Sequence, residues 1–216
     1  NFSHIYYLLR DLGIKEVDGI LADFGTSQHQ ITDSAGFSFS RDTLLDMRMS
    51  TSHGQKTAYW YVNRATESEL ISIFSDYGQE RYSRRIARAI CDYRQSKDIK
   101  TTLDLAEIIK RSVPPSFTSK IHPATRVFQA LRIVVNKELD HIRTLLLQSV
   151  NTLADNGRIV CISFHSLEDR IVKQFFKEHK TEFEILTPKV VIPTEEEVYR
   201  NPSSRSSKLR AALRHK

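Results

Sequence analysis

The sequence predicts an α/β fold in which a sheet is interrupted by an all-helical insert. Two short apolar runs, at residues 17–22 and 158–163, have the composition of buried strands. More than 130 residues separate these runs, and most of them show the spacing of helices. Because such a connection is too long for an ordinary crossover between strands, we expect a separate helical subdomain.

The first elements follow from local patterns. Residues 3–12 place apolar side chains on one helical face, and Gly13 ends that helix. Residues 17–22 form a strand that delivers Asp23 at its carboxyl end. Residues 24–50 are rich in Gly, Ser, Thr and Asp, which indicates a loop.

The middle of the chain is predicted to be helical. Thr66 and Thr101 are expected to cap helices, and Pro114-Pro115 ends the block. We expect four helices, at residues 57–63, 67–77, 80–95 and 102–112.

The last third is predicted to begin with one long helix. The spacing of its leucines, isoleucines and valines extends that helix from residue 124 to residue 153. A turn at Asn156-Gly157, a strand at 158–163 and a helix at 167–177 follow. The tail suggests a final strand pair, drawn from residues 183–185, 190–192 and 205–214.

These elements predict a divided core. Residues 1–43 and 121–216 are expected to be the two parts of one α/β domain, and residues 44–120 to be the helical insert.

Composition excludes several classes of protein. The chain has 216 residues, of which 40% are hydrophobic and 27% charged, so it is globular rather than disordered or fibrous. A net charge of +6 permits a polyanionic partner. The two cysteines lack metal-ligand spacing, so we expect no metal site, no disulfide framework and a reducing compartment. No apolar run approaches the ~20 residues that cross a membrane.

The segment from Asp23 to Gln30 is the first candidate site. A carboxylate at a strand end, followed by Gly25 and by small hydroxyl residues such as Ser27, can line a ligand crevice. The alternative is a turn in which Asp23 bonds its own backbone as the chain leaves the strand.

Aromatic and basic residues suggest a second kind of site. Phe37 and Phe39 can stack on a flat ligand, or can fold onto the core. Arg84, Arg85 and Arg88 share one side of a predicted helix, where they can track phosphates or remain a solvated face. Candidate anion-binding residues elsewhere are Arg126, at the start of the long helix, and Arg205 and Arg210 in the basic tail.

The run from Ser163 to Arg170 packs a histidine, hydroxyls and carboxylates into one strand-to-helix turn. A hydrolytic Ser-His-acid site is one interpretation, and a metal site using His165, Glu168 and Asp169 is another. The third is a helix start with Ser166 as the cap, which leaves His165 free to border a pocket.

Together and in this order, the motifs resemble the bacterial 16S ribosomal RNA cytosine-N4 methyltransferases of the MraW/RsmH type. The resemblance covers nearly the whole chain. Its motifs are DGIL with Asp23, Gly25, Ser27 and Gln30; GFSF at 36–39; LDMRM at 45–49; YGQER at 77–81; RIARAI at 85–90; HPATR at 122–126 with FQALRI at 128–133; SFHSLEDR at 163–170; and Asn201-Pro202 with Arg205-Ser206.

The resemblance implies a Rossmann-like class I methyltransferase domain, S-adenosylmethionine as methyl donor, and a cytidine of 16S rRNA in the small ribosomal subunit as target. It implies that Phe2, Asp23 and Gln30 contact the cofactor, and that the family's glycine-rich cofactor loop precedes residue 1. A cytoplasmic protein is expected, and a homodimer remains open.

For the chemistry, we expect Asp23 to accept a hydrogen bond from the target amine, with Ser27 and His165 as its partners. Phe37 or Phe39 would stack on the base, and the arginines named above would contact phosphates. The alternative is a relative that binds RNA without transferring a methyl group.

Overall fold

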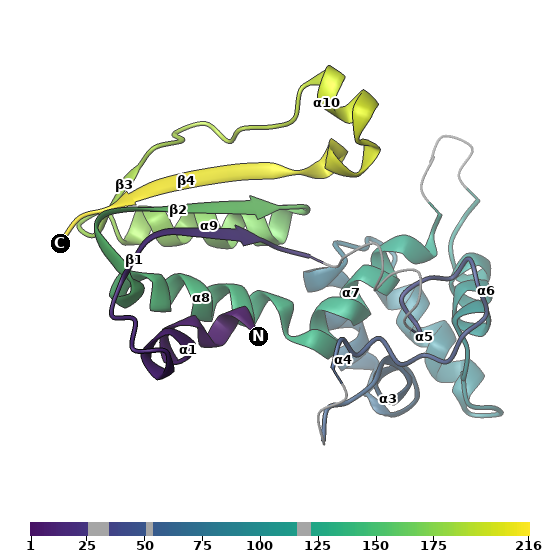
Figure 1. Cartoon of the computed structure of the whole chain (residues 1–216). Coiled ribbons are helices and arrows are strands. Elements are labelled where there is room, and N and C mark those ends of the chain that lie inside the picture. Colours follow the sequence, from purple (N-terminus) through teal and green to yellow (C-terminus); the bar gives the residue numbers. More distant parts are fainter. Residues whose placement is uncertain (26–34, 51–53, 116–121) are drawn as a thin grey trace. The chain divides into compact units, whose positions relative to one another are not determined.

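The computed structural model describes residues 1–25, 35–50, 54–115 and 122–216. The chain divides into two compact units (Figure 1). One combines Asn1–Gly25 with Glu138–Lys216, and the other spans Thr26–Lys137. We call them the sheet unit and the helical unit.

The sheet unit contains a four-stranded mixed sheet among its described residues. The strand order is β1 (Val17–Asp23), β2 (Leu153–Ser163), β4 (Lys208–Arg214) and β3 (Phe183–Ile185). The β1 and β2 strands are parallel, whereas β4 runs antiparallel to both β2 and β3. The expected mixture of α and β structure is therefore present, with β1 at one edge of the sheet (Figure 1).

The register of β1 on β2 positions one end of the sheet. Asp23 lies opposite Ile162, and the Phe24 amide donates a hydrogen bond of 2.9 Å to the Ile162 carbonyl. Side chains alternate along this stretch: Ala22 and Phe24 are buried, so Asp23 between them is exposed. Because both strands are parallel, their carboxyl ends meet at this edge.

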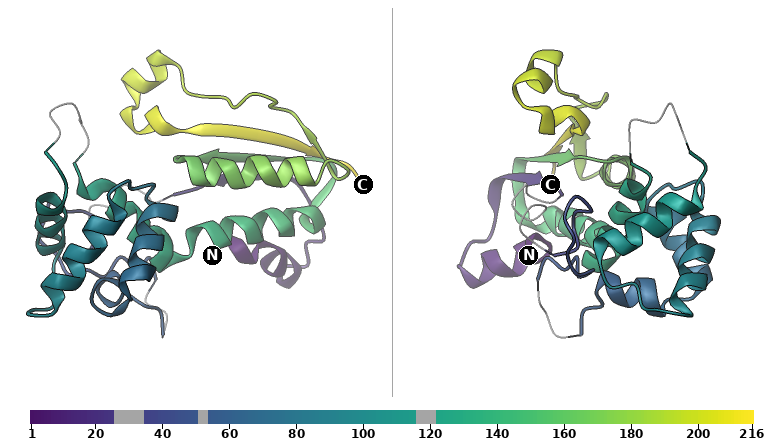
Figure 2. Two further views of the ribbon diagram at one scale, coloured as in Figure 1. Left: turned by 180° about the vertical axis from the view of Figure 1, so that it is seen from behind. Right: turned by 90° about the vertical axis from the view of Figure 1, so that its right-hand side faces the viewer.

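Helices pack along the sheet. The chain starts with a short turn, η1 (Phe2–His4), and α1 (Ile5–Asp11). Both contact α8 (Glu138–Thr152), which also packs on α9 (Ser166–Glu178). The left panel of Figure 2 shows α8 and α9 running beside the strands, seen from behind. The tail adds α10 (Glu195–Arg200) and η3 (Pro202–Ser206) before β4.

The helical unit has a hydrophobic core of its own. Its helices are α3 (Ala58–Arg64), α4 (Glu67–Ser72), which continues as the π-helical turn η2 (Ile73–Tyr77), α5 (Ser83–Arg94), α6 (Thr102–Ser112) and α7 (Ala124–Asn136). Thr66 and Thr101 cap α4 and α6, as the sequence predicts. The core includes Met47, Phe74, Ile86, Leu105 and Leu131, each fully buried or nearly so.

The prediction of one long helix at 124–153 is wrong. Lys137 adopts a left-handed conformation, with φ 50° and ψ 36°, and separates α7 from α8. The side-chain Nδ2 of Asn136 donates a hydrogen bond to the Met47 carbonyl at 2.7 Å, and its Oδ1 accepts one from the Met49 backbone amide at 2.8 Å. These bonds fix the end of α7, which apolar periodicity alone does not reveal.

Other boundaries differ from expectation. β2 begins at Leu153, before the expected turn, and the compact helical unit is wider than the predicted insert at 44–120. In the tail, β3 pairs with β4 as a strand pair, whereas residues 190–192 contribute only the single bridge Val191–Leu209.

Candidate functional site

Asp23 is an exposed carboxylate at the carboxyl end of β1. Partial burial raises the pKa of this carboxyl above its ordinary value, and the negative charge of Glu168 raises it further. A second acidic group therefore lies close to the expected catalytic residue.

Glu168 holds the turn between β2 and α9. Its side chain is buried, and its Oε2 accepts hydrogen bonds from the backbone amides of Phe164, at 2.8 Å, and His165, at 3.3 Å. The cap expected at Ser166 is therefore wrong: His165 occupies the N-cap position, and Glu168 reaches back to it from the first turn of α9.

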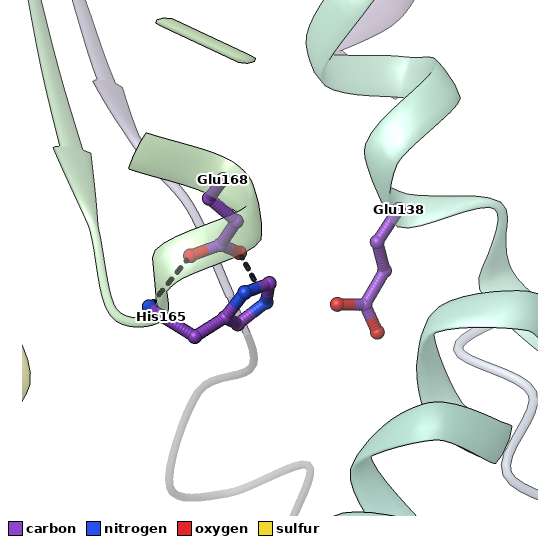
Figure 3. A group of neighbouring side chains, drawn as sticks. All are labelled: Glu138, His165 and Glu168. Atoms are coloured by element: carbon purple, nitrogen blue, oxygen red, sulfur yellow. Dashed lines mark hydrogen bonds and ion pairs between the residues drawn. The ribbon is translucent and has the colours of Figure 1, made fainter. Parts of the chain in front are cut away.

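His165 lies between two carboxylates (Figure 3). Its Nε2 is 3.2 Å from Oε1 of Glu168, and its side chain is 13% exposed. Glu138, the first residue of α8 and also buried, faces the imidazole from the other side. One ligand-type atom from each of the three residues lies within 4.8 Å of the others.

Phe2 joins this end of the sheet unit. The residue is 45% exposed, and its ring centroid lies 5.9 Å from that of Phe24 and 6.2 Å from that of His141 on α8. An expected cofactor contact thus lies beside the residue that follows Asp23. Ser27 and Gln30, the other residues expected here, lie outside the described residues.

Arg210 does not fit its expected role as a surface phosphate contact. It is buried in β4, where its Nε and Nη2 bond the two carboxylate oxygens of Asp169 at 2.6 and 3.1 Å. This bidentate pair satisfies the guanidinium inside the unit and ties α9 to the sheet. Arg205, by contrast, is exposed in η3.

In the helical unit, α5 presents a basic face. Arg84, Arg85 and Arg88 are exposed, whereas Ile86 and Ile90 on the opposite face are fully buried. The expected amphipathic arrangement is therefore present.

The other residues of this unit that were predicted to contact RNA differ in their exposure and in their contacts. Arg126 is exposed and donates a hydrogen bond of 3.2 Å to the Gln79 carbonyl. Phe37 is half-buried. Phe39 stacks on His122, with ring centroids 4.6 Å apart, and also contacts Phe128, so it packs on the core as well as reaching the surface.

Sequence reasoning missed Glu138 and placed Glu168 only in the alternative metal site and the helix start, not beside Asp23. Glu138 was hidden because the predicted long helix ran through it without a break. The signal for Glu168 was present, since a glutamate three residues after an N-cap position typically reaches back to the cap.

Among the described residues, no helix is long and apolar enough to cross a membrane.

Comparison with known proteins assigns a family to this arrangement. The family model described as the MraW methylase family matches residues 1–215. A protein of Sulfurihydrogenibium sp. strain YO3AOP1 is 49% identical over 217 residues, which cover 99% of this chain and 74% of the relative. One from Ehrlichia chaffeensis is 46% identical over 222 residues, covering 99% and 75%. One from Koribacter versatilis is 50% identical over 205 residues, covering 93% and 64%.

All three relatives carry the name ribosomal RNA small subunit methyltransferase H. The similarity extends through both compact units and includes the end of the sheet that carries Asp23 and His165. The chain therefore belongs to the MraW methylase family, a family of methyl-transferring enzymes, and its mixed sheet with the intervening helices is a Rossmann-like methyltransferase fold.

Proposed function

We propose that this chain methylates the N4 amine of a cytidine in 16S rRNA of the small ribosomal subunit, with S-adenosylmethionine as the methyl donor. The names of the relatives support ribosomal RNA of the small subunit as the substrate. The observation that carries the proposal is the exposed Asp23 carboxylate at the carboxyl edge of a parallel strand pair, where α/β enzymes bind their ligands.

The side chains near this edge fit part of the cofactor. Phe2 offers an exposed aromatic face, which suits a flat purine, and Asp23 offers a carboxylate, which suits a cationic group. When bound, S-adenosylmethionine supplies an electrophilic methyl group on a sulfonium.

Asp23 would then orient the nucleophile. The N4 lone pair of cytosine is conjugated into the ring, so the nitrogen is a weak nucleophile. A carboxylate that accepts a hydrogen bond from the amine holds the nitrogen in position and favours its more tetrahedral, nucleophilic geometry. His165 would border this site, and Ser27 is proposed as a further polar partner.

The helical unit would bind the RNA backbone. The exposed arginines of α5 and the net charge of +6 support contacts with phosphates. Arg126 is a further candidate in this unit, and Arg205 is one in the sheet unit. Phe37 and Phe39 are proposed to stack on an unpaired base, because an enzyme reaches the amine only after the base leaves its helix. Action on the small subunit would place the protein in the cytoplasm.

Substitution of Asp23 tests the catalytic proposal. We expect Asp23→Asn to lower methylation of unmodified small subunits by at least about 100-fold, since general acid–base and positioning groups contribute on this scale. Transfer of a labelled methyl group measures the rate, and nucleoside mass spectrometry identifies the N4-methylated product. Asp18→Asn, an exposed change on the same strand, is the matched control.

Two results would contradict the proposal. Undiminished methylation by Asp23→Asn would remove Asp23 from the mechanism. Calorimetry that detects RNA binding but no S-adenosylmethionine binding would instead favour the binding-only relative.

A further inference from the structure

We propose that Glu138, His165 and Glu168 bind a divalent transition-metal ion. The site lies within the sheet unit, between the start of α8 and the turn from β2 to α9 (Figure 3). It shares His165 with the border of the proposed methyl-transfer site, but metal binding does not depend on that function. The sequence analysis named His165, Glu168 and Asp169 as an alternative metal site but assigned no metal. In the structure Asp169 pairs with Arg210, and Glu138, distant along the chain, is the third residue of the cluster.

The geometry of the first pair already suits one ion. Zinc lies about 2.0–2.2 Å from carboxylate oxygen and imidazole nitrogen, so two ligands at right or tetrahedral angles are about 2.8–3.6 Å apart. Nε2 of His165 and Oε1 of Glu168 are separated by 3.2 Å. Glu138, whose ligand oxygen lies within 4.8 Å of both, completes three ligands after a small side-chain movement.

The surroundings of His165 point to a ligand. Both ring nitrogens are shielded from solvent. Nε2 faces Oε1 of Glu168 at 3.2 Å, but neither ring nitrogen makes a hydrogen bond of good geometry among the described residues. Buried polar atoms of this kind are rare, and a bound ion is one of the ordinary explanations for them. A neutral imidazole offers one ring nitrogen as a metal ligand.

The charge of the pocket favours a cation. Glu138 is 8% exposed and Glu168 is fully buried, so two carboxylates face one imidazole away from solvent. A divalent ion between the two carboxylates would reduce the repulsion between their charges.

The donor set indicates the class of ion. Imidazole suits zinc and other later transition metals, whereas carboxylates suit manganese and magnesium. One imidazole with two carboxylates, and no sulfur, therefore favours Zn²⁺ or Mn²⁺ over Mg²⁺ or Cu⁺. Three protein ligands leave a coordination position for water.

Hydrogen bonds from the backbone orient Glu168 toward the proposed ion. Oε2 of Glu168 is already fixed by the backbone amides of Phe164 and His165, which leaves Oε1 directed toward the imidazole. Such outer contacts orient metal ligands in proteins. The ion would fasten α8 to the turn beside Asp23.

Metal binding by the purified chain tests the proposal. After treatment with a chelator and exchange into Mn²⁺ or Zn²⁺, we expect about one equivalent of ion per chain by elemental analysis. The affinity follows from a titration with Mn²⁺, in which the electron paramagnetic resonance signal of the free ion decreases as the ion binds the protein. The ion should also raise the melting temperature, because it binds the folded state, and a chelator should reverse the shift.

Substitutions on both sides of the site assign the ligands. We expect Glu138→Gln and His165→Gln each to weaken binding at least about tenfold and to reduce the metal-dependent shift in melting temperature. Glu178→Gln and His4→Gln are matched controls at exposed positions and should bind like the unmodified chain. Glu168→Gln also disturbs the helix start, so the other two variants carry the test.

Several outcomes would overturn the proposal. The proposal fails if the unmodified chain retains neither Mn²⁺ nor Zn²⁺. It also fails if Glu138→Gln binds metal as tightly as its control Glu178→Gln, or if His165→Gln binds as tightly as the unmodified chain.

Discussion

At the scale of single residues, Gly78 shows how closely two helices approach. A Cβ added to Gly78 would lie 2.6 Å from the Arg126 carbonyl oxygen and 2.7 Å from that of Phe74. Both obstacles are backbone atoms, which cannot turn away as a side chain does. The absence of a side chain at residue 78 is therefore what allows α7 to pack against η2.

We expect Gly78→Ala to lower the free energy of unfolding by about 1–3 kcal/mol, the usual cost of overpacking. Urea titration followed by circular dichroism measures the change. Gly19→Ala is the control, since its nearest obstacle lies 3.8 Å away. Equal stability of the two variants would show that the backbone relaxes at residue 78.

The burial of Cys161 predicts how its thiol reacts. The residue lies fully buried in β2, and burial raises the pKa of its thiol to about 12. Because the thiolate is the reactive form, we expect Cys161 to resist thiol reagents in the folded chain and to react on unfolding. The folded state also loses stability as pH rises from about 9 toward 12, because only the unfolded thiol ionises there. Peptide mapping after labelling distinguishes Cys161 from Cys91. Rapid labelling of Cys161 in the folded chain at neutral pH would contradict the expected protection of its thiol.

At the scale of elements, α5 combines a packing face with a basic face. Ile86, Ala87 and Ile90 are fully buried, which orients the helix and leaves the arginines exposed. The hydrophobic contacts thus determine which face the charges occupy. The sequence predicted both faces because helical periodicity assigns them without any tertiary information.

Replacing Arg84, Arg85 and Arg88 with glutamine should weaken RNA binding and reduce its salt dependence. Each lost phosphate contact on a single strand lowers the slope of log affinity against log salt by about 0.7. The control removes three charges elsewhere, by changing Lys173, Lys177 and Lys180 to glutamine, all exposed on or after α9. If both triple variants lose the same slope, net charge rather than the α5 face governs binding.

At the scale of the whole molecule, the two units are built differently. The helical unit is one continuous stretch of chain with a large buried core, whereas the sheet unit is assembled from two separate stretches. We therefore expect residues 26–137 to fold alone, with helical circular dichroism and a cooperative urea transition. A broad transition without cooperativity would show that the core depends on the remainder of the chain.

The elements that were predicted well have local causes. Thr66 and Thr101 cap helices through bonds within four residues, and the apolar runs at β1 and β2 make those strands recognisable. The break at Lys137 was missed because Asn136 is held by Met47 and Met49, which lie far away in the sequence. Arg210 was misjudged for the same reason, since its partner Asp169 lies on another element.

The sequence by itself determined the α/β class, the family resemblance, Asp23 at a strand end and the basic face of α5, because each depends on periodicity or on motifs of adjacent residues. Only the tertiary structure decided that Glu138 faces His165 and Glu168, and that Arg210 is buried in an ion pair. These contacts join residues distant in the chain, and no local pattern records which buried charges will meet when strands and helices pack.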